Sequence, residues 1–182
     1  VLAACDEPLE IGLAHRALMQ LLPVEHFSNT VRRLIDAKLV QRVVQMGSVR
    51  LGLAEPDFAE SVCHALDSDR VEVLHRALHE AAREDHAQSQ KLSVFIAQHA
   101  FAAGDIDVAL EAGVPASRQL FGSGALEEAA ELIGCVLEHT SDAVICAELH
   151  AMAVDVWARL GRWRSALGHC EHLEQYVVGL KG

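Results

Sequence analysis

The feature that most constrains the fold is an apolar stretch that stops at a glycine and resumes after a short polar step. It occurs three times, as FIAQHAFAAGDIDVAL from Phe95, RQLFGSGALEEAAEL from Arg118 and DVWARLGRWRSALGH from Asp155. Glycine ends helices readily because, without a Cβ, it adopts the left-handed conformation at little cost. The recurrence predicts helices joined by tight turns at Gly104, Gly124 and Gly161.

Two further positions recur around these glycines. An alanine follows each glycine by five residues (Ala109, Ala129 and Ala166), and Ala97, Ser117 and Val154 precede them by seven. Small residues there would let paired helices approach closely, at the spacing of tetratricopeptide (TPR) repeats, and Trp157 stands where that repeat often has a large aromatic. The glycines lie 20 and 37 residues apart, against a TPR period of about 34. We therefore expect a degenerate, right-handed TPR-like α-solenoid over 88–182.

The rest of the apolar pattern predicts a mainly helical chain with one hairpin. Apolar residues make up 51% of the chain and aromatics only 4%, and alanine and leucine favour helices. Helical spacing predicts helices over 8–22, 27–38, 57–67, 70–84, 89–103, 106–121, 125–138, 142–160 and 163–178, with a kink at Pro115. The segment LVQRVVQMGSVRLGLA, from Leu39 to Ala54, predicts a β-hairpin that turns at Met46, Gly47 and Ser48.

Helix, helix and hairpin follow one another in the order of a winged helix-turn-helix. We therefore expect a small winged-helix domain over 1–54, connecting helices over 55–87 and the helical repeats over 88–182.

Charge is unevenly distributed along the chain. The formal net charge is −11, yet residues 28–54 carry +4 and the remainder −15. The basic residues of this segment are Arg32, Arg33, Lys38, Arg42 and Arg50, and they are the candidate interaction residues.

Three interpretations of this basic segment stay open: a solvated face, contact with an acidic protein surface, or DNA binding with the second helix in a major groove. A chain this acidic is a poor nucleic-acid binder, and only Ser28, Asn29 and Thr30 could read base edges. We expect no direct nucleic-acid binding by this chain, and DNA binding through segment 28–54 is the alternative function.

Three segments in this order resemble a known family. They are RVEVLHRALHEAARE from Arg70, AQHAFAAGDIDVALEAG from Ala97 and GALEEAAELI from Gly124. Together with the winged-helix order, they resemble the region after the nucleotide-binding module of STAND-type signalling ATPases, as in large ATP-binding transcriptional regulators of the LuxR and MalT-like kind. The resemblance implies that the winged helix packs on a nucleotide-binding domain of the same parent chain, and that the repeats bind a protein or small effector.

The chemistry of such regulators has no counterpart here. The GxxxxGK[ST] loop that cradles ATP phosphates is missing from the sequence, and nothing resembles a LuxR-type DNA-binding helix-turn-helix. We expect no cofactor. Together with the missing methionine at Val1, this suggests a middle segment of a longer protein.

No arrangement of nucleophile, base and orienting residue is visible, so we expect no enzymatic activity and no catalytic residues. Ser61, Ser93 and Ser117 lack the glycines of a nucleophile elbow. Cys63 and His64 would point about 100° apart on a helix.

Histidines are numerous, but we expect no metal site. His75 and His79 share a helix face, with His64 and His86 nearby in sequence, and His169, Cys170 and His172 share the last helix. The HExxH pattern is missing, and Cys170 would point away from the two histidines beside it.

Five cysteines at wide spacings, without a CxxC pair, favour a reducing compartment, so we expect a cytoplasmic protein. No apolar run approaches the roughly 18 residues of a membrane span, so we expect no membrane contact. The overall prediction is a non-enzymatic regulatory or sensor segment that acts by binding.

Overall fold

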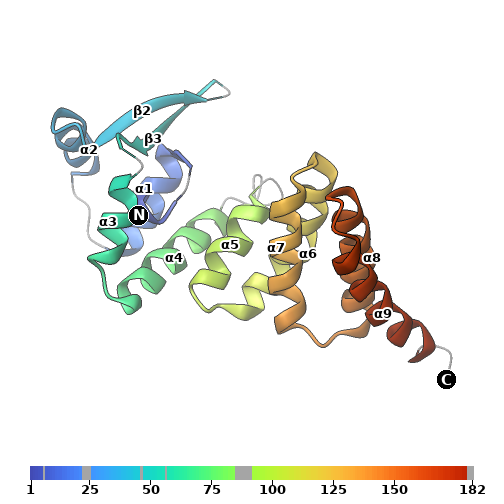
Figure 1. Cartoon of the computed structure of the whole chain (residues 1–182). Helices are drawn as coiled ribbons and strands as arrows, with labels where there is room; N and C mark the ends of the chain where they lie inside the picture. The colour runs from blue at the N-terminus through green and yellow to red at the C-terminus, as the bar shows by residue number, and fades with distance from the viewer. Residues whose placement is uncertain (6, 22–25, 46, 56, 85–91, 180–182) are drawn as a thin grey trace. The chain divides into compact units, whose positions relative to one another are not determined.

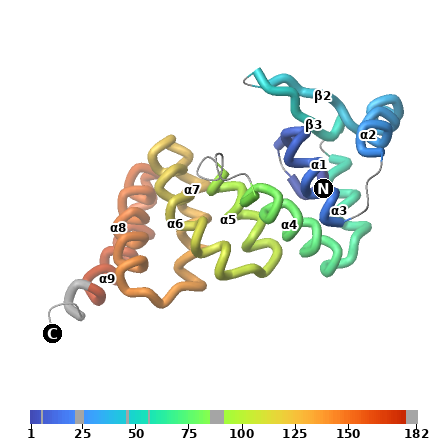
Figure 2. The backbone as a smooth tube through the Cα atoms, turned by 180° about the vertical axis from the view of Figure 1, so that it is seen from behind, coloured from blue at the N-terminus to red at the C-terminus, as the bar shows by residue number. Residues whose placement is uncertain are grey.

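The computed structural model describes residues 1–5, 7–21, 26–45, 47–55, 57–84 and 92–179. Within these residues the chain is mainly helical, with nine α-helices, a short 3-10 helix η1 (Leu2–Ala4) and one small three-stranded antiparallel sheet (Figure 1). It divides into two compact units, the first made of 1–89 with 102–104 and the second of 90–101 with 105–182. Figure 2 follows the same path of the backbone from behind.

The first unit contains the sheet and four helices. Its elements are β1 (Leu9–Glu10), α1 (Ile11–Leu21), α2 (Phe27–Asp36), β2 (Val40–Gln45), β3 (Ser48–Leu53), α3 (Asp57–His64) and α4 (Ser68–Arg83). The predicted hairpin is confirmed: β2 pairs with β3 from Val40 opposite Leu53 to Gln45 opposite Ser48. Gly47 has a φ of 79°, which suits a hairpin turn, whereas Met46, predicted at the same turn, lies outside the described residues.

The helix predicted from residue 8 begins three residues later. Leu9 and Glu10 form β1, which pairs with Leu51 and Arg50 of β3, so the order of the sheet is β1-β3-β2. Leu9 is buried in this arrangement. A strand of two residues is too short to show an alternation of apolar and polar residues. The sequence therefore could not distinguish it from the start of the helix that follows at Ile11.

The core of the first unit forms where α1 pairs with α4. Leu13, Ala14 and Ala17 of α1 are buried, as are four apolar residues of α4, namely Ala77, Leu78, Ala81 and Ala82. The Arg16 guanidinium donates to the Ala81 carbonyl over 3.2 Å. Helices α3 and α4, which we expected to form a separate connecting segment, lie within this unit.

Helix α2 packs loosely, because none of its residues is fully buried. Its apolar side faces an apolar hollow of about 660 Å³ bordered by α1, α3 and the sheet. The lining includes Leu18, Val31, Leu34, Leu53 and Val62.

The second unit consists of helices. They are α5 (Ser93–Ala102, whose last residue belongs to the first unit), α6 (Ile106–Ser123), α7 (Leu126–His139), α8 (Ala143–Arg159) and α9 (Trp163–Gly179). Two pairs pack most extensively, α6 with α7 and α8 with α9, and α7 also packs on α8 (Figure 1). One apolar cluster joins α5 to α8, with Ala97, Leu120, Ile133, Val136 and Leu149 among its members.

The three predicted glycine turns share one hydrogen-bond pattern. Gly104, Gly124 and Gly161 have φ values of 71°, 84° and 71°. In each turn, the amide of the residue that follows the glycine donates to the carbonyl five residues earlier. The carbonyl of this same residue then accepts a hydrogen bond from the amide of the recurring alanine, four residues later. The bonds are Asp105 to Ala100, Ala125 to Leu120 and Arg162 to Trp157, followed by Ala109 to Asp105, Ala129 to Ala125 and Ala166 to Arg162. The alanine therefore closes the first turn of the following helix.

The alanines Ala109, Ala129 and Ala166 are all buried, as are Ala97 and Ser117, whereas Val154 is only half-buried. The small buried residue of α8 is its neighbour Ala153, so the helix is rotated by one position relative to our expectation. Trp157 packs on the apolar cluster. Helix α6 continues through Pro115, where we expected a kink.

Candidate functional site

Helix α2 has two chemically different sides. Phe27, Val31 and Leu34 line the apolar hollow of the first unit, whereas Arg32 and Arg33 are exposed. An amphipathic helix of this kind exposes its cations to solvent or to a binding partner.

Helix α2 ends in the same kind of turn as the three glycine turns, but a lysine occupies the glycine position. Lys38 has a φ of 57° and is the only non-glycine residue with a positive φ in the described part of the chain. The Leu39 amide donates to the Leu34 carbonyl over 3.0 Å, which is the bond that closes the glycine turns. A left-handed conformation costs a non-glycine residue about 1–3 kcal/mol and clusters at functional sites.

A hollow of about 520 Å³ lies between the end of α2 and the start of β2. Its lining residues are Arg32, Ile35, Lys38, Val40, Gln41, Arg42 and Ala54. We call this feature the basic hollow. Three of the five cations predicted from the sequence meet here, and the lining also contains the aliphatic side chains of Val40, Ala54 and Ile35 of α2.

The cations around the basic hollow have no acidic partner among the described residues of the first unit. The side chains of Arg32, Arg33, Lys38 and Arg42 form no hydrogen bond or ion pair there, although the exposed Asp36 lies on the same helix. Like charges held together without a counter-charge raise the local positive potential. The basic hollow is therefore suited to an anionic group or an acidic surface.

The other two predicted cations lie apart from the basic hollow. Arg33 is exposed on α2 but does not line it. Arg50 pairs with Val43 across the hairpin and donates to the Pro8 carbonyl over 3.4 Å. Arg42 is paired with Leu51, and since successive strand residues face opposite sides, Arg42 and Arg50 lie on opposite faces of the sheet.

The outer end of the hairpin is apolar. Val44 and Val49 are directly opposite each other and are 73% and 44% exposed. Strand alternation places Val44 on the same face as Arg42 and the buried Val40. The sequence showed these β-branched residues, but only the register shows that an exposed apolar pair continues from the basic hollow.

The candidate nucleophiles of the sequence are engaged with backbone or amide groups. The Ser61 and Ser117 hydroxyls donate to the Asp57 and Gly113 carbonyls, and the Ser93 hydroxyl donates to Gln119 Oε1. The Cys63 thiol donates to the Ala3 carbonyl over 3.2 Å.

The candidate metal ligands are also distributed. His64 contacts Glu60 on the surface of α3, His79 is buried in α4, and His86 lies outside the described residues. His169 and His172 lie beside His150 of α8, which the sequence did not single out. Among the described residues, no three side chains are arranged to hold a metal ion.

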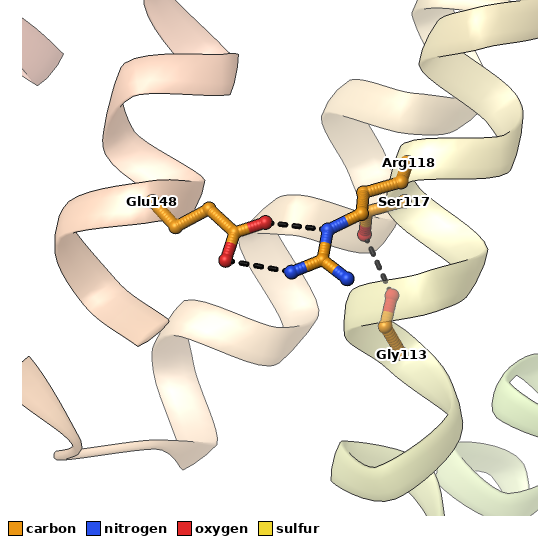
Figure 3. A network of polar contacts seen from close by, with 4 residues as sticks. All are labelled: Gly113, Ser117, Arg118 and Glu148. Carbon is orange, nitrogen blue, oxygen red and sulfur yellow. Dashed lines mark hydrogen bonds and ion pairs between the residues drawn. The ribbon is translucent and has the colours of Figure 1, made fainter. Parts of the chain in front are cut away.

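A second exposed feature joins α6 to α8 in the other unit. The Arg118 guanidinium donates to both carboxylate oxygens of Glu148, over 2.6 Å and 2.8 Å (Figure 3). This pairing lowers the pKa of Glu148. The residue before Arg118, the buried Ser117, donates its hydroxyl to the carbonyl of Gly113, one turn earlier in α6, over 2.8 Å. The bidentate pair links α6 to α8, the first helices of the two hairpins.

In the described parts of the chain, no helix combines the length and apolarity that crossing a bilayer requires. No family model matches the chain, and no curated protein or solved structure is significantly similar to it.

Proposed function

We propose that this chain is a non-enzymatic regulatory segment whose first unit binds an acidic protein surface through the basic hollow. The observation that carries the proposal is the meeting of Arg32, Lys38 and Arg42 around one hollow, where their side chains have no acidic partner among the described residues of the unit. This cluster of positive charge stands out because the chain as a whole has a net charge of −11.

The left-handed Lys38 supports the same function. Glycine fills this position in the other three turns of this kind. A lysine here costs stability, and it places an ammonium at the rim of the basic hollow. Its contribution to binding would offset that cost.

In this proposal the first unit is a winged helix and the second a pair of TPR-like hairpins. The order of two helices followed by a hairpin, with β1 paired at the edge of β3, supports the winged-helix interpretation. The 37 residues between the turns at Gly124 and Gly161, close to the period of about 34 in TPR arrays, support the TPR-like interpretation. The acidic partner is then a surface of the nucleotide-binding domain in the parent protein, and the effector, a protein or small molecule, binds the α6 and α8 side of the repeats.

DNA binding is the second candidate, favoured by the exposure of Ser28, Asn29 and Thr30 beside Arg33 on α2. A hairpin that follows a DNA backbone uses cations, because phosphate contacts dominate affinity. The tip here offers Val44 and Val49 instead. An apolar tip next to a basic hollow fits a protein that combines carboxylates with apolar side chains.

The test is a binding titration of the intact chain at about 0.15 M salt, where screening acts over about 8 Å. One probe is a helical peptide rich in glutamate and leucine, and the other is a set of duplex DNAs. We expect Arg42→Glu to weaken peptide binding at least about tenfold, which corresponds to about 1.4 kcal/mol. Arg164→Glu, an equal charge reversal at an exposed arginine of α9, should leave it unchanged.

Equal losses in the two variants would show that only net charge matters, and the basic hollow would not be the site. Sequence-selective, submicromolar binding of duplex DNA that is lost with Arg42→Glu would replace this function with DNA binding.

A further inference from the structure

Three histidines lie together between the last two helices. His150 of α8 is 8% exposed, and its Nδ1 lies 2.8 Å from Nδ1 of His169 on α9. The His172 ring stacks on His150 with centroids 5.0 Å apart and planes at 18°, and Tyr176 stacks at 5.8 Å. The cluster is part of the contact that holds the two helices together.

Helical spacing explains why these side chains meet. His169, His172 and Tyr176 occupy one face of α9, because residues three, four and seven apart share a side of a helix. Cys146 and His150, four apart, occupy the facing side of α8. The tight turn at Gly161 brings the two faces together.

The contact between His150 and His169 restricts how many protons the cluster can hold. Between two neutral imidazoles, one Nδ1 carries a hydrogen and the other accepts it. One added proton leaves this hydrogen bond intact. A second added proton makes both nitrogens donors, so the 2.8 Å contact becomes repulsive and must open.

Among the described residues, no acidic side chain contributes to the pKa shifts of His150 and His169. The groups that face His150 are His169, His172, Tyr176 and the buried Cys146. Glu148, on the same helix, is bound to Arg118 of α6. Burial, then His169 and His172, lowers the pKa of His150, and burial, then His172, lowers the pKa of His169. No side chain of α7 is among these causes in the described residues.

We propose that the cluster of His150, His169 and His172 is a pH-sensitive latch that holds α9 on α8 near neutral pH and releases it in acid. The histidines keep the hairpin closed while they are neutral. Release uncovers the side of α8 that α9 covers, and it removes the last helix from the surface of the second unit.

The direction of the pH effect follows from proton linkage. Both pKa values are lower in the closed hairpin than the ordinary 6.5, so the open hairpin binds protons first as the pH falls. The stabilisation is complete above about 6.5 and is lost as the pH falls from that value through the lower values of the closed state.

Hydrogen exchange of the intact chain, measured by mass spectrometry at about pH 7.5 and about pH 5 on either side of the ordinary histidine pKa, tests the latch. After correction for the intrinsic pH dependence of exchange, we expect α9 amides to exchange faster in acid while α6 and α7 stay protected. His169→Asn keeps a side chain that can form a hydrogen bond but cannot be protonated, so it should abolish this change. His139→Asn is the matched control, since His139 is an exposed histidine whose Nδ1 lies 2.8 Å from the Cys135 carbonyl.

Equal protection of α9 at both pH values in the unsubstituted chain would overturn the proposal. Loss of the pH dependence in His139→Asn would also overturn it. If His169→Asn does not fold, titration of the histidine rings by NMR in the unsubstituted chain decides: pKa values of His150 and His169 at or above 6.5 would contradict the latch.

Discussion

The end of α2 and the ends of α5, α6 and α8 form the same turn with different residues. In each, the residue at the turn has a positive φ, and the next amide donates to the carbonyl five residues earlier. Three of the turns use glycine, whereas α2 uses Lys38. The three glycine turns lead directly into another helix, and the lysine turn leads into a strand beside the basic hollow.

In the function proposed here, this difference separates a turn residue with a structural role from one that also serves binding. Glycine is the residue that a left-handed turn favours on energetic grounds, and the three glycine turns have open space where a Cβ would stand. Their requirement is therefore conformational. At Lys38 the same conformation costs conformational free energy. This cost is consistent with a side chain that contributes to binding, as proposed for the basic hollow.

The largest effect is expected at the alanine that follows each glycine turn. Ala129 is completely buried, and its amide closes the first turn of α7. Ala129→Leu should overpack this site and lower the free energy of unfolding by about 1–3 kcal/mol, measured by chemical denaturation. Ala151→Leu, the same substitution at an exposed position inside α8, should change it by less than about 0.5 kcal/mol. Equal effects would show that the alanine position tolerates large residues and that the turn does not specify close packing.

A smaller effect is expected at the glycine itself. Gly124→Ala places a Cβ on a residue with a φ of 84° and should destabilise the chain by about 1 kcal/mol. Gly134→Ala, inside α7 with nothing within 4 Å of the added Cβ, should instead stabilise it by up to about 1 kcal/mol. Thermal denaturation of the two variants should therefore shift in opposite directions. A shift in the same direction would remove the conformational explanation of the glycine turns.

The sequence predicted those parts of the fold that depend on local spacing. Helical periodicity placed α4 to α9 to within a few residues, and the β-branched runs around Gly47 placed the hairpin. Contacts between distant residues were not predictable. A Cβ at Gly113 would stand 2.6 Å from Val136 of α7, so this glycine marks a close approach of two helices. Nothing in the sequence around Gly113 indicates this contact, because it depends on how α6 packs against α7.

The candidate site shows the same limit. Counting charges identified Arg32, Lys38 and Arg42 but also included Arg50, because the faces of the hairpin depend on its register. The exposed Val44 and Val49 became visible only with that register. His150 was missed because it lies 19 residues from His169, and no periodicity within one helix relates them.

The smallest expected change in stability is at the lysine turn, and it carries the most information about the comparison. Lys38→Gly relieves the left-handed strain and should stabilise the chain by up to about 1 kcal/mol. It also removes a cation from the basic hollow, so binding of the acidic peptide should weaken. Lys38→Ala removes the same charge but keeps a Cβ at positive φ, so it should weaken binding without a gain in stability. Denaturation and peptide titration of both variants separate the two contributions.

If Lys38→Gly stabilises the chain and leaves peptide binding unchanged, the strain at Lys38 is unrelated to the basic hollow, and the contrast with the glycine turns has no functional meaning.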